Sequence, residues 1–292
     1  MSWSFRLGRV RGIDIRVHYT FLFLMAVVVM VGGGRTPAAF LSLVAGLVLL
    51  FTCVVLHELG HSVVAQAHGI RVRDITLLPI GGIARLEEVP EEPWTELKIA
   101  VAGPMVNLAI FILLTPFVLM GSGPAFLGGA PGAIGELVVF LWTANFMLMA
   151  FNLLPAFPLD GGRVLRAILA MRMDFLRATE TAAKVGRVIA VGLVLIGLFG
   201  GGLALFGVVA AGGLIWLIVI GLFIMLAGAN EVRLVKLRRW RRRFVTPEGA
   251  EIIPPGSPDD PPQEPRPGLL FDFGVTDRRQ ILEEFNRLFR RM

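Results

Sequence analysis

Charge and cysteine are both scarce in this sequence. Charged residues make up 17% of its 292 positions, whereas soluble domains carry about 25%. The single cysteine, Cys53, excludes an intramolecular disulfide and fits a small core residue. Apolar residues make up 55% of the chain, and its mean hydropathy is +0.73. Together these values exclude an ordinary soluble domain and predict a polytopic membrane protein.

Basic residues exceed acidic ones only modestly, with a formal net charge of +6. The arginines cluster at the ends of apolar stretches, which is the pattern of membrane topology signals, so we expect no nucleic-acid partner. Residues 1–16 mix polar and apolar positions, contain four arginines and are not closely followed by a small-residue cleavage site. We therefore expect no cleavable signal peptide.

Residues 51–61 place two histidines and a carboxylate at the end of an apolar helix. His57 and His61 are four positions apart, so on a helix both imidazoles project from one face and can hold one Zn²⁺. Glu58 can then reach a metal-bound water as general base. An ionisable residue within a membrane segment is costly unless it is paired or metal-bound. The location therefore favours a metal site over solvated surface residues.

Apolar stretches predict an all-α polytopic membrane fold with six transmembrane helices. The third is expected to kink or loosen at Gly103-Pro104, which would let Asn107 project inward. The fifth and sixth spans contain almost no polar groups, so they are predicted to form a scaffold or a substrate gate. Residues 163–187, which precede these two spans, are expected to lie at the membrane interface. The predicted spans are 19–31, 38–67, 96–120, 136–154, 188–199 and 206–228.

Two segments predict β structure at the membrane surface. Residues 3–18 alternate apolar and polar positions, as in a hairpin or strand pair. Residues 70–86, after the second span, predict a β-hairpin or small sheet with a turn at 79–82. The expected domains are a membrane-surface β segment (1–18), a six-helix core (19–232), a basic juxtamembrane run with a disordered proline-rich linker (233–267) and a C-terminal amphipathic helix (268–292).

Basic residues precede the first span and follow the second, fourth and sixth spans. By the positive-inside rule, both termini and the 70–86 hairpin face the cytosol. This places His57 and His61 on the cytosolic side of the membrane, and Asp160, just after the fourth span, at the same depth. The arginine-rich composition and the absence of large lumenal insertions favour a prokaryotic cell membrane. The C-terminal helix is expected to dock on the protein body or on the bilayer.

A catalytic zinc site needs a third protein ligand and an open position for water. Asp160 is favoured because it follows a helix end broken by prolines, and because Gly161 and Gly162 permit close backbone approach. Glu87 or Glu88 competes, since many soluble zinc proteases take a glutamate that follows the histidine pair. The remaining candidates were His18, His68, Asp74, Glu91 and Glu92.

The His57-Glu58-Leu59-Gly60-His61 segment, the stretch from Asn152 to Gly161 and the layout of six spans resemble the site-2 protease family of intramembrane zinc metalloproteases. The resemblance covers residues 1–228. It implies one Zn²⁺ per chain, held by His57, His61 and Asp160, with Glu58 as the catalytic base. It also implies that Asn107 and Asn152 help to hold the substrate or the oxyanion.

The sequence thus predicts an intramembrane zinc metalloprotease that works in the lipid bilayer and hydrolyses peptide bonds in or near the transmembrane segments of membrane-protein substrates, as in regulated intramembrane proteolysis. The hairpin at 72–86 would offer an edge strand to the extended substrate. The alternative is a divalent metal transporter, but its path would need polar residues spread across the bilayer. A proteolytically inactive scaffold ranks last because Glu58 is intact. The oligomeric state is left open, a homo-oligomer included.

Overall fold

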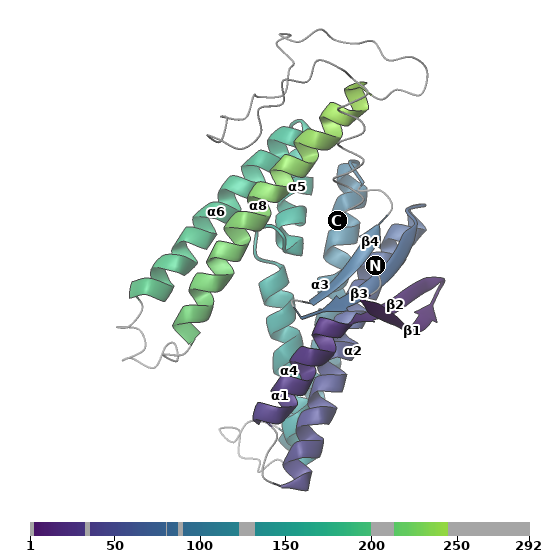
Figure 1. The fold of residues 1–292 in the computed structure, drawn as a ribbon, viewed down its shortest axis with the longest axis vertical. Helices are drawn as coiled ribbons and strands as arrows, with labels where there is room; N and C mark the ends of the chain where they lie inside the picture. The colour runs from purple at the N-terminus through teal and green to yellow at the C-terminus, as the bar shows by residue number, and fades with distance from the viewer. Residues whose placement is uncertain are drawn as a thin grey trace. The chain divides into compact units, whose positions relative to one another are not determined.

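The protein folds into apolar helices and one small sheet (Figure 1). A computed structural model describes residues 3–32, 36–79, 81–86, 90–122, 132–199 and 213–244. Residues Met1–Leu237 form one compact unit, and the chain from Arg238 onwards belongs to a second. The helices are α1 (Tyr19–Gly32), α2 (Pro37–Ala67), α3 (Pro93–Phe117), the π-helical turn η1 (Val118–Ser122), α4 (Ala133–Asn152), α5 (Asp160–Ala170), α6 (Phe175–Phe199) and α8 (Gly213–Phe244).

Among the described residues, five helical segments are long and apolar enough to cross a membrane. They are α2, α3 with the start of η1, α4, α6 and α8. Helix α1 is apolar as well, but it has 14 residues, fewer than the roughly 20 that a full crossing needs. The prediction of a polytopic helical membrane protein is confirmed, whereas the count of six spans is not.

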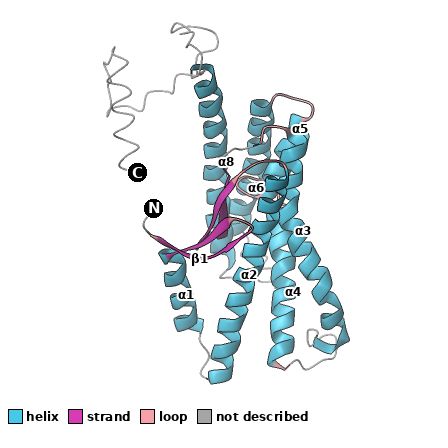
Figure 2. Ribbon diagram, turned by 90° about the vertical axis from the view of Figure 1, so that its right-hand side faces the viewer, coloured by secondary structure: helices cyan, strands magenta, loops and turns pink. Residues whose placement is uncertain are grey.

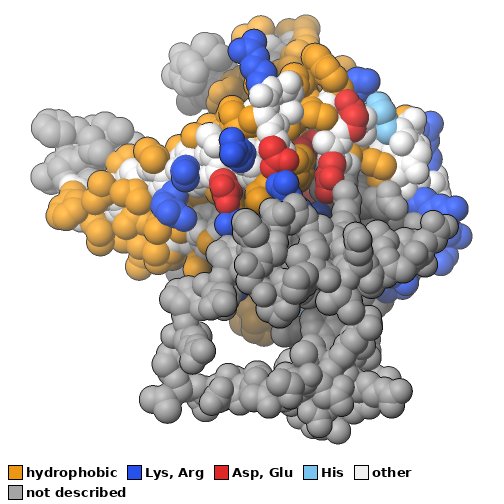
Figure 3. All heavy atoms as spheres, turned by 90° about the horizontal axis from the view of Figure 1, so that it is seen from above, with side chains coloured by type: hydrophobic (Ala, Val, Ile, Leu, Met, Phe, Trp, Pro, Cys, Tyr) orange, Lys and Arg blue, Asp and Glu red, His pale blue; other side chains and the backbone are white. Residues whose placement is uncertain are grey.

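Large apolar side chains lie exposed along these helices. Val188, Phe199, Trp216 and Leu226 are each more than 60% exposed. In the view from above, hydrophobic side chains cover the part of the molecule that extends to the left, while lysine, arginine and acidic side chains gather nearer its centre (Figure 3). Apolar surface on this scale is typical of a protein that faces lipid.

Helix α6 differs from the prediction, because it begins at Phe175 rather than at residue 188. The face of this helix that packs inward consists of small residues, among them Ala178, Ala182 and Gly186. The basic residues of the same stretch lie exposed on other faces. Residues 175–187 are thus an amphipathic part of one long helix that continues into the predicted fifth span.

The basic run at 233–243, which is predicted to anchor at the membrane surface, is helical and continues α8 as far as Phe244. Helix α3 runs from Pro93 to Phe117 and includes Gly103-Pro104, where the sequence predicts a kink or a loosening. The predicted linker, the C-terminal helix and the start of the sixth span at 206–212 lie outside the described residues.

The sheet combines the two segments that were predicted as separate hairpins. Its order is β1 (Ser4–Val10), β2 (Ile13–His18), β3 (Val72–Leu78) and β4 (Gly81–Leu86). Each hairpin is antiparallel, and strands β2 and β3 pair in parallel to join them (Figure 2). Strands β1 and β4 therefore form the two edges.

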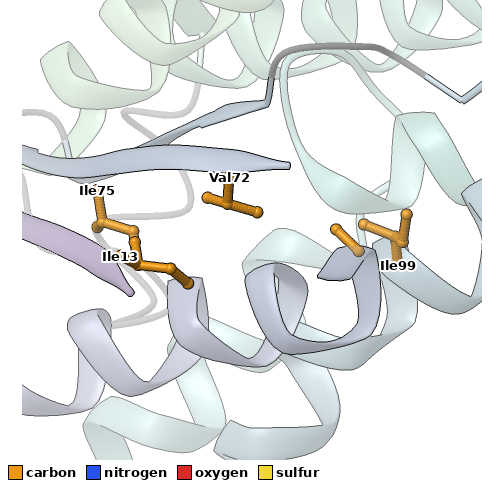
Figure 4. Packing of buried hydrophobic residues seen from close by; sticks show 5 residues of the cluster. Ile13, Val72, Ile75 and Ile99 are labelled. Carbon is orange, nitrogen blue, oxygen red and sulfur yellow. The ribbon is translucent and has the colours of Figure 1, made fainter. Parts of the chain in front are cut away.

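A cluster of buried side chains attaches the sheet to the helices. Ile13 and Ile75 from the sheet are fully buried, and so are Ala65 of α2 and Ile99 of α3 (Figure 4). Val72 completes the cluster. Burying a branched aliphatic side chain contributes about 1.5–3 kcal/mol. These contacts fix the sheet against the ends of α2 and α3 that carry the candidate site.

Candidate metal centre

Two histidines of α2 meet the side chain of Asp160 from α5, which lies about 100 residues further along the chain. His57 Nε2 lies 3.1 Å from Asp160 Oδ2, and His61 Nε2 lies 3.2 Å from the same oxygen. The two Nε2 atoms are 3.1 Å apart. All three side chains are buried. The structure thus brings together the three residues that were predicted as metal ligands.

The other nitrogen of each imidazole is occupied. His57 Nδ1 lies 2.9 Å from Asn107 Oδ1, and His61 Nδ1 lies 2.6 Å from the Ile99 carbonyl oxygen. Both partners can only accept, so each Nδ1 carries the proton and donates it. Each neutral ring then presents a bare lone pair at Nε2.

Two Nε2 lone pairs and a carboxylate oxygen consequently face one another, and none of these three atoms brings a proton to the others. Such a group is repulsive unless a cation lies among its members. A tetrahedral zinc ion with ligand distances of about 2.0–2.2 Å would hold neighbouring ligand atoms about 3.3 Å apart. The observed spacings of 3.1–3.2 Å fit this ion without rearrangement.

Asp160 is the first residue of α5. Side chains at the next two positions would overlap the backbone of the preceding loop, because a β-carbon at Gly161 would meet the carbonyls of Leu153 and Leu154. The glycines thus let the helix start directly against the loop. Asp160 is buried, and neither Nε2 supplies a proton to it, so its carboxylate oxygen faces the two lone pairs. An ionised carboxylate is the form that ligates metal.

Helix α3 passes directly over the two imidazoles at Gly103. A β-carbon at this position would overlap His61 Nε2 and lie 2.7 Å from His57 Nε2. Only glycine fits there while the rings keep their positions. The glycine predicted to loosen the helix instead makes room for the histidine pair.

Glu58 projects from the same turn of α2 as the histidines, and its side chain lies against the edge strand β4. A β-carbon added at Gly82 would be 2.5 Å from Glu58 Cγ and 3.3 Å from Glu58 Oε1. The glycine pair of the predicted turn therefore allows the sheet edge to reach the carboxylate.

The other candidate ligands lie elsewhere or have other partners. His18 is half-buried and lies 2.7 Å through Nδ1 from Thr20 Oγ1, while His68 is exposed and its Nδ1 bonds the Val64 carbonyl. Asp74 pairs with Arg16 across the sheet. Glu92 caps α3 by accepting from Trp94 N and Thr95 N, and hydrogen bonding from Thr95 lowers the pKa of this exposed carboxyl. Glu91 is not in the metal cluster, and Glu87 and Glu88 lie outside the described residues.

The two asparagines assigned to substrate or oxyanion binding have different surroundings. Asn107 is fully buried, and its Oδ1 is taken by His57. Its Nδ2 has no hydrogen-bond partner within the described part of the chain. Asn152 is half-buried, and its Nδ2 donates to the Leu148 carbonyl in its own helix.

Sequence analysis missed a buried arginine close to the site. Arg166 was assigned to membrane topology, yet it is only 1% exposed and bonds to Glu96 and Glu231. Glu96 begins the third predicted span, and an acid in an apolar segment calls for a basic partner, whereas Glu231 adjoins the basic run of α8. The sequence therefore indicates that a buried acid needs a basic partner, but it does not identify which arginine is that partner.

Comparisons with known proteins bear on this geometry. The model of peptidase family M50 matches residues 45–135 and 129–193. A solved structure, the site-2 protease from Methanocaldococcus jannaschii, superposes with a TM-score of 0.52 at 37% sequence identity. The match covers 79% of this chain and 96% of that one.

Two further relatives match most of the chain. A zinc metalloprotease of Methanocaldococcus jannaschii is 36% identical over 237 residues, and the protein Rip3 of Mycobacterium tuberculosis is 38% identical over 238 residues. These matches cover 81% and 77% of this chain. The chain spans 63% and 58% of the length of these two relatives.

Proposed function

This chain belongs to peptidase family M50, the site-2 protease family, and on that basis we propose that it is an intramembrane zinc metalloprotease. Its substrates would be membrane proteins, cut within or near their transmembrane segments. The observation that carries the proposal is the triangle of His57 Nε2, His61 Nε2 and Asp160 Oδ2, three facing ligand atoms beside an acid. Zinc suits this set of two imidazoles and one carboxylate.

The proposed mechanism assigns the proton transfers to Glu58. When bound, zinc polarises the scissile carbonyl and lowers the pKa of water towards about 7. Glu58 takes a proton from the attacking water and delivers it to the leaving amine. Asn107 keeps the His57 ring in place through Oδ1, and its unpartnered Nδ2 remains available to donate to the oxyanion. Asn152 can donate to the oxyanion only if its Nδ2 gives up the hydrogen bond to the Leu148 carbonyl.

The substrate is proposed to bind as an extended strand along β4. A transmembrane helix hides its peptide carbonyls in its own hydrogen bonds, so it must unwind before it is cut. Strand β4 is an edge of the sheet, and at Gly82 it lies against Glu58. A peptide added to this edge would pass beside the proposed base. Strand β3 is already paired on both sides, so the edge offered within the 72–86 hairpin is β4.

Single prolines at positions 83 and 84, one of them pointing outwards and the other inwards, test this strand addition; position 82 is avoided because a side chain there would meet Glu58. In an antiparallel pair, alternate residues point both N–H and C=O outwards. A proline at an outward position removes only a donor to the substrate, so cleavage should fall about tenfold while zinc affinity stays unchanged. A proline at an inward position should destabilise the sheet. Cleavage rates and zinc affinity would be measured on both variants, and unaltered cleavage with the outward proline would argue against strand addition.

Metal removal tests the proposed function itself. The purified protein would be reconstituted with a single-span substrate that carries a helix-breaking residue near its cytosolic end. Cleavage should fall to background after chelation and return on addition of Zn²⁺. The alternative, a metal transporter, predicts that zinc crosses the bilayer of proteoliposomes while the substrate stays intact. Cleavage that persists in metal-free protein would exclude a metalloprotease.

The membrane arrangement is also part of the proposal. Helix α1 is assigned as a sixth crossing, around which the bilayer would thin to match its 14 residues. Both termini would face the cytosol of a prokaryotic cell. Arg166 no longer counts as a topology signal because it is buried, but Arg163 and Arg172 still follow the fourth span.

A further inference from the structure

A buried arginine, Arg166, joins α5 to two other helices. It lies in the second half of α5, away from Asp160 at the start of that helix. Arg166 donates from Nε to Glu96 Oε1 of α3 at 2.9 Å, and from Nη1 to Glu231 Oε1 of α8 at 2.6 Å. Its guanidinium carbon lies 5.0 Å from the centre of the Phe157 ring and 4.9 Å from that of Phe175. We call these five residues the Arg166 cluster. It connects α3, α5, α6, α8 and the loop before α5.

The bonding geometry of the cluster is specific to arginine. Nη2 also donates to Glu96 Oε1, so the guanidinium contacts Glu96 through two nitrogens and Glu231 through a third. A lysine ammonium is a compact charge and cannot reproduce this fork, nor does it stack flat between two rings. Buried charges of this kind are costly unless every partner is present. The cluster therefore holds its helices in one relative arrangement.

That arrangement determines where Asp160 lies relative to His61. Arg166 is six residues after Asp160 on α5, about 9 Å along the helix axis. Glu96 is three residues before Ile99 on α3, one turn from the carbonyl that accepts from His61 Nδ1. The contact between Arg166 and Glu96 thus joins the helix that carries one ligand to the turn of α3 that orients another.

Helix α8 contributes to this arrangement in two ways. Its Glu231 bonds to Arg166, and other side chains of α8 pack against the loop before α5. Ala156 and Leu159 of this loop pack with Ala190 of α6 and Ile224 of α8 in a buried cluster. Phe157, in the same loop, packs near Val232 of α8 and stacks on Arg166. The last described helix consequently contacts both the arginine and the segment from which Asp160 emerges.

We propose that Arg166 is a positioning residue for the metal centre, and that Glu231 makes the placement of Asp160 depend on helix α8. Arg166 lies too far along α5 to be a ligand itself, and it acts by holding α5 at the correct distance from α3. The inference rests on the proposed function, since it takes His57, His61 and Asp160 as ligands of zinc.

The test compares three variants of the full chain: Arg166→Lys, Glu231→Gln and Lys236→Gln. Lys236 is the matched control, because its ion pair with Glu180 at 2.8 Å also joins α8 to α6 but is half-exposed and has no bond to α5. Zinc affinity would be measured by competition with a chromophoric chelator, and ligand geometry by the visible spectrum of the cobalt-loaded protein. Size-exclusion chromatography would select folded material.

Arg166→Lys should weaken zinc binding about tenfold or more and change the cobalt spectrum, as expected when a residue that supports metal ligands is altered. Glu231→Gln, which keeps the shape of the side chain, should shift both readouts in the same direction by a smaller factor. Lys236→Gln should match the wild type. If Arg166→Lys does not fold, Glu231→Gln decides the question.

Wild-type affinity and spectrum in Glu231→Gln would overturn the positioning role, even if that variant unfolds at a lower temperature. An equal loss in Lys236→Gln would also overturn it, because general packing of α8 would then explain the effect. A wild-type protein that binds no zinc would instead contradict the proposed function, and the inference would fall with it.

Discussion

Replacing Glu58 with glutamine is expected to lower the rate of substrate cleavage about 10³-fold, to near background. Glutamine has almost the same shape, but its amide cannot accept the proton of the attacking water. Glu58 is not one of the three converging ligand groups, so zinc affinity should stay within about twofold of the wild type. The measurement is the single-turnover cleavage rate in proteoliposomes, with zinc content determined on the same samples.

Glu180→Gln provides the control for this variant. Glu180 is a half-buried acid of α6 whose ion-pair partner is Lys236, and it lies outside the metal cluster, so its loss should leave cleavage unchanged. If Glu58→Gln cleaves at the wild-type rate, the base lies elsewhere or the activity belongs to a contaminant. A Glu58→Gln variant that has also lost zinc would mean that Glu58 supports the metal as well as the proton transfer.

Replacing Gly103 with alanine is expected to have a comparably large effect, although only a methyl group is added. That methyl would overlap His61 Nε2 and lie 2.7 Å from His57 Nε2, so one or both rings must turn away. At least one ligand atom would then leave the triangle that the two Nε2 atoms form with Asp160. We expect zinc affinity to fall at least about 100-fold, with loss of cleavage, since even changes outside the ligand set cost 10–100-fold.

Gly192→Ala is the matched control, because a β-carbon at this position of α6 meets nothing within 4 Å. Alanine is the better helix former by about 1 kcal/mol, so this variant should be as stable as the wild type or slightly more so. Zinc affinity and thermal unfolding would be measured for both variants. Wild-type zinc affinity in Gly103→Ala would show that α3 does not pass so close to the imidazoles.

Much of the metal centre could be inferred from the sequence because its signals are local. The spacing of His57 and His61 places them on one helix face whatever the rest of the chain does. Asp160 could be grouped with them because charge patterning and a broken helix end put it at the same depth. Both arguments use features of single segments, and the structure brings these three side chains together.

What could not be inferred depends on pairing between distant segments. Nothing in residues 13–18 specifies a parallel partner at 72–78, and the choice becomes fixed only when Ile13 and Ile75 share one core. Arg166 resembles its neighbouring arginines in sequence, yet burial between α3 and α8 gives it a different role. The start of α6 at Phe175 was missed because the buried face of its first turns consists of small residues, so those turns do not stand out as an apolar helix in the sequence.

The distance along the chain between the ligands has a consequence for biosynthesis. Asp160 follows His57 by 103 positions, and a ribosome adds about 5–20 residues per second. For at least roughly 5 s, a nascent protein therefore holds a histidine pair without its carboxylate partner. Until α5 has been synthesised and docks on α3, the chain should lack a complete zinc site. Newly made copies would then be unable to cut neighbouring membrane proteins, or one another, during insertion.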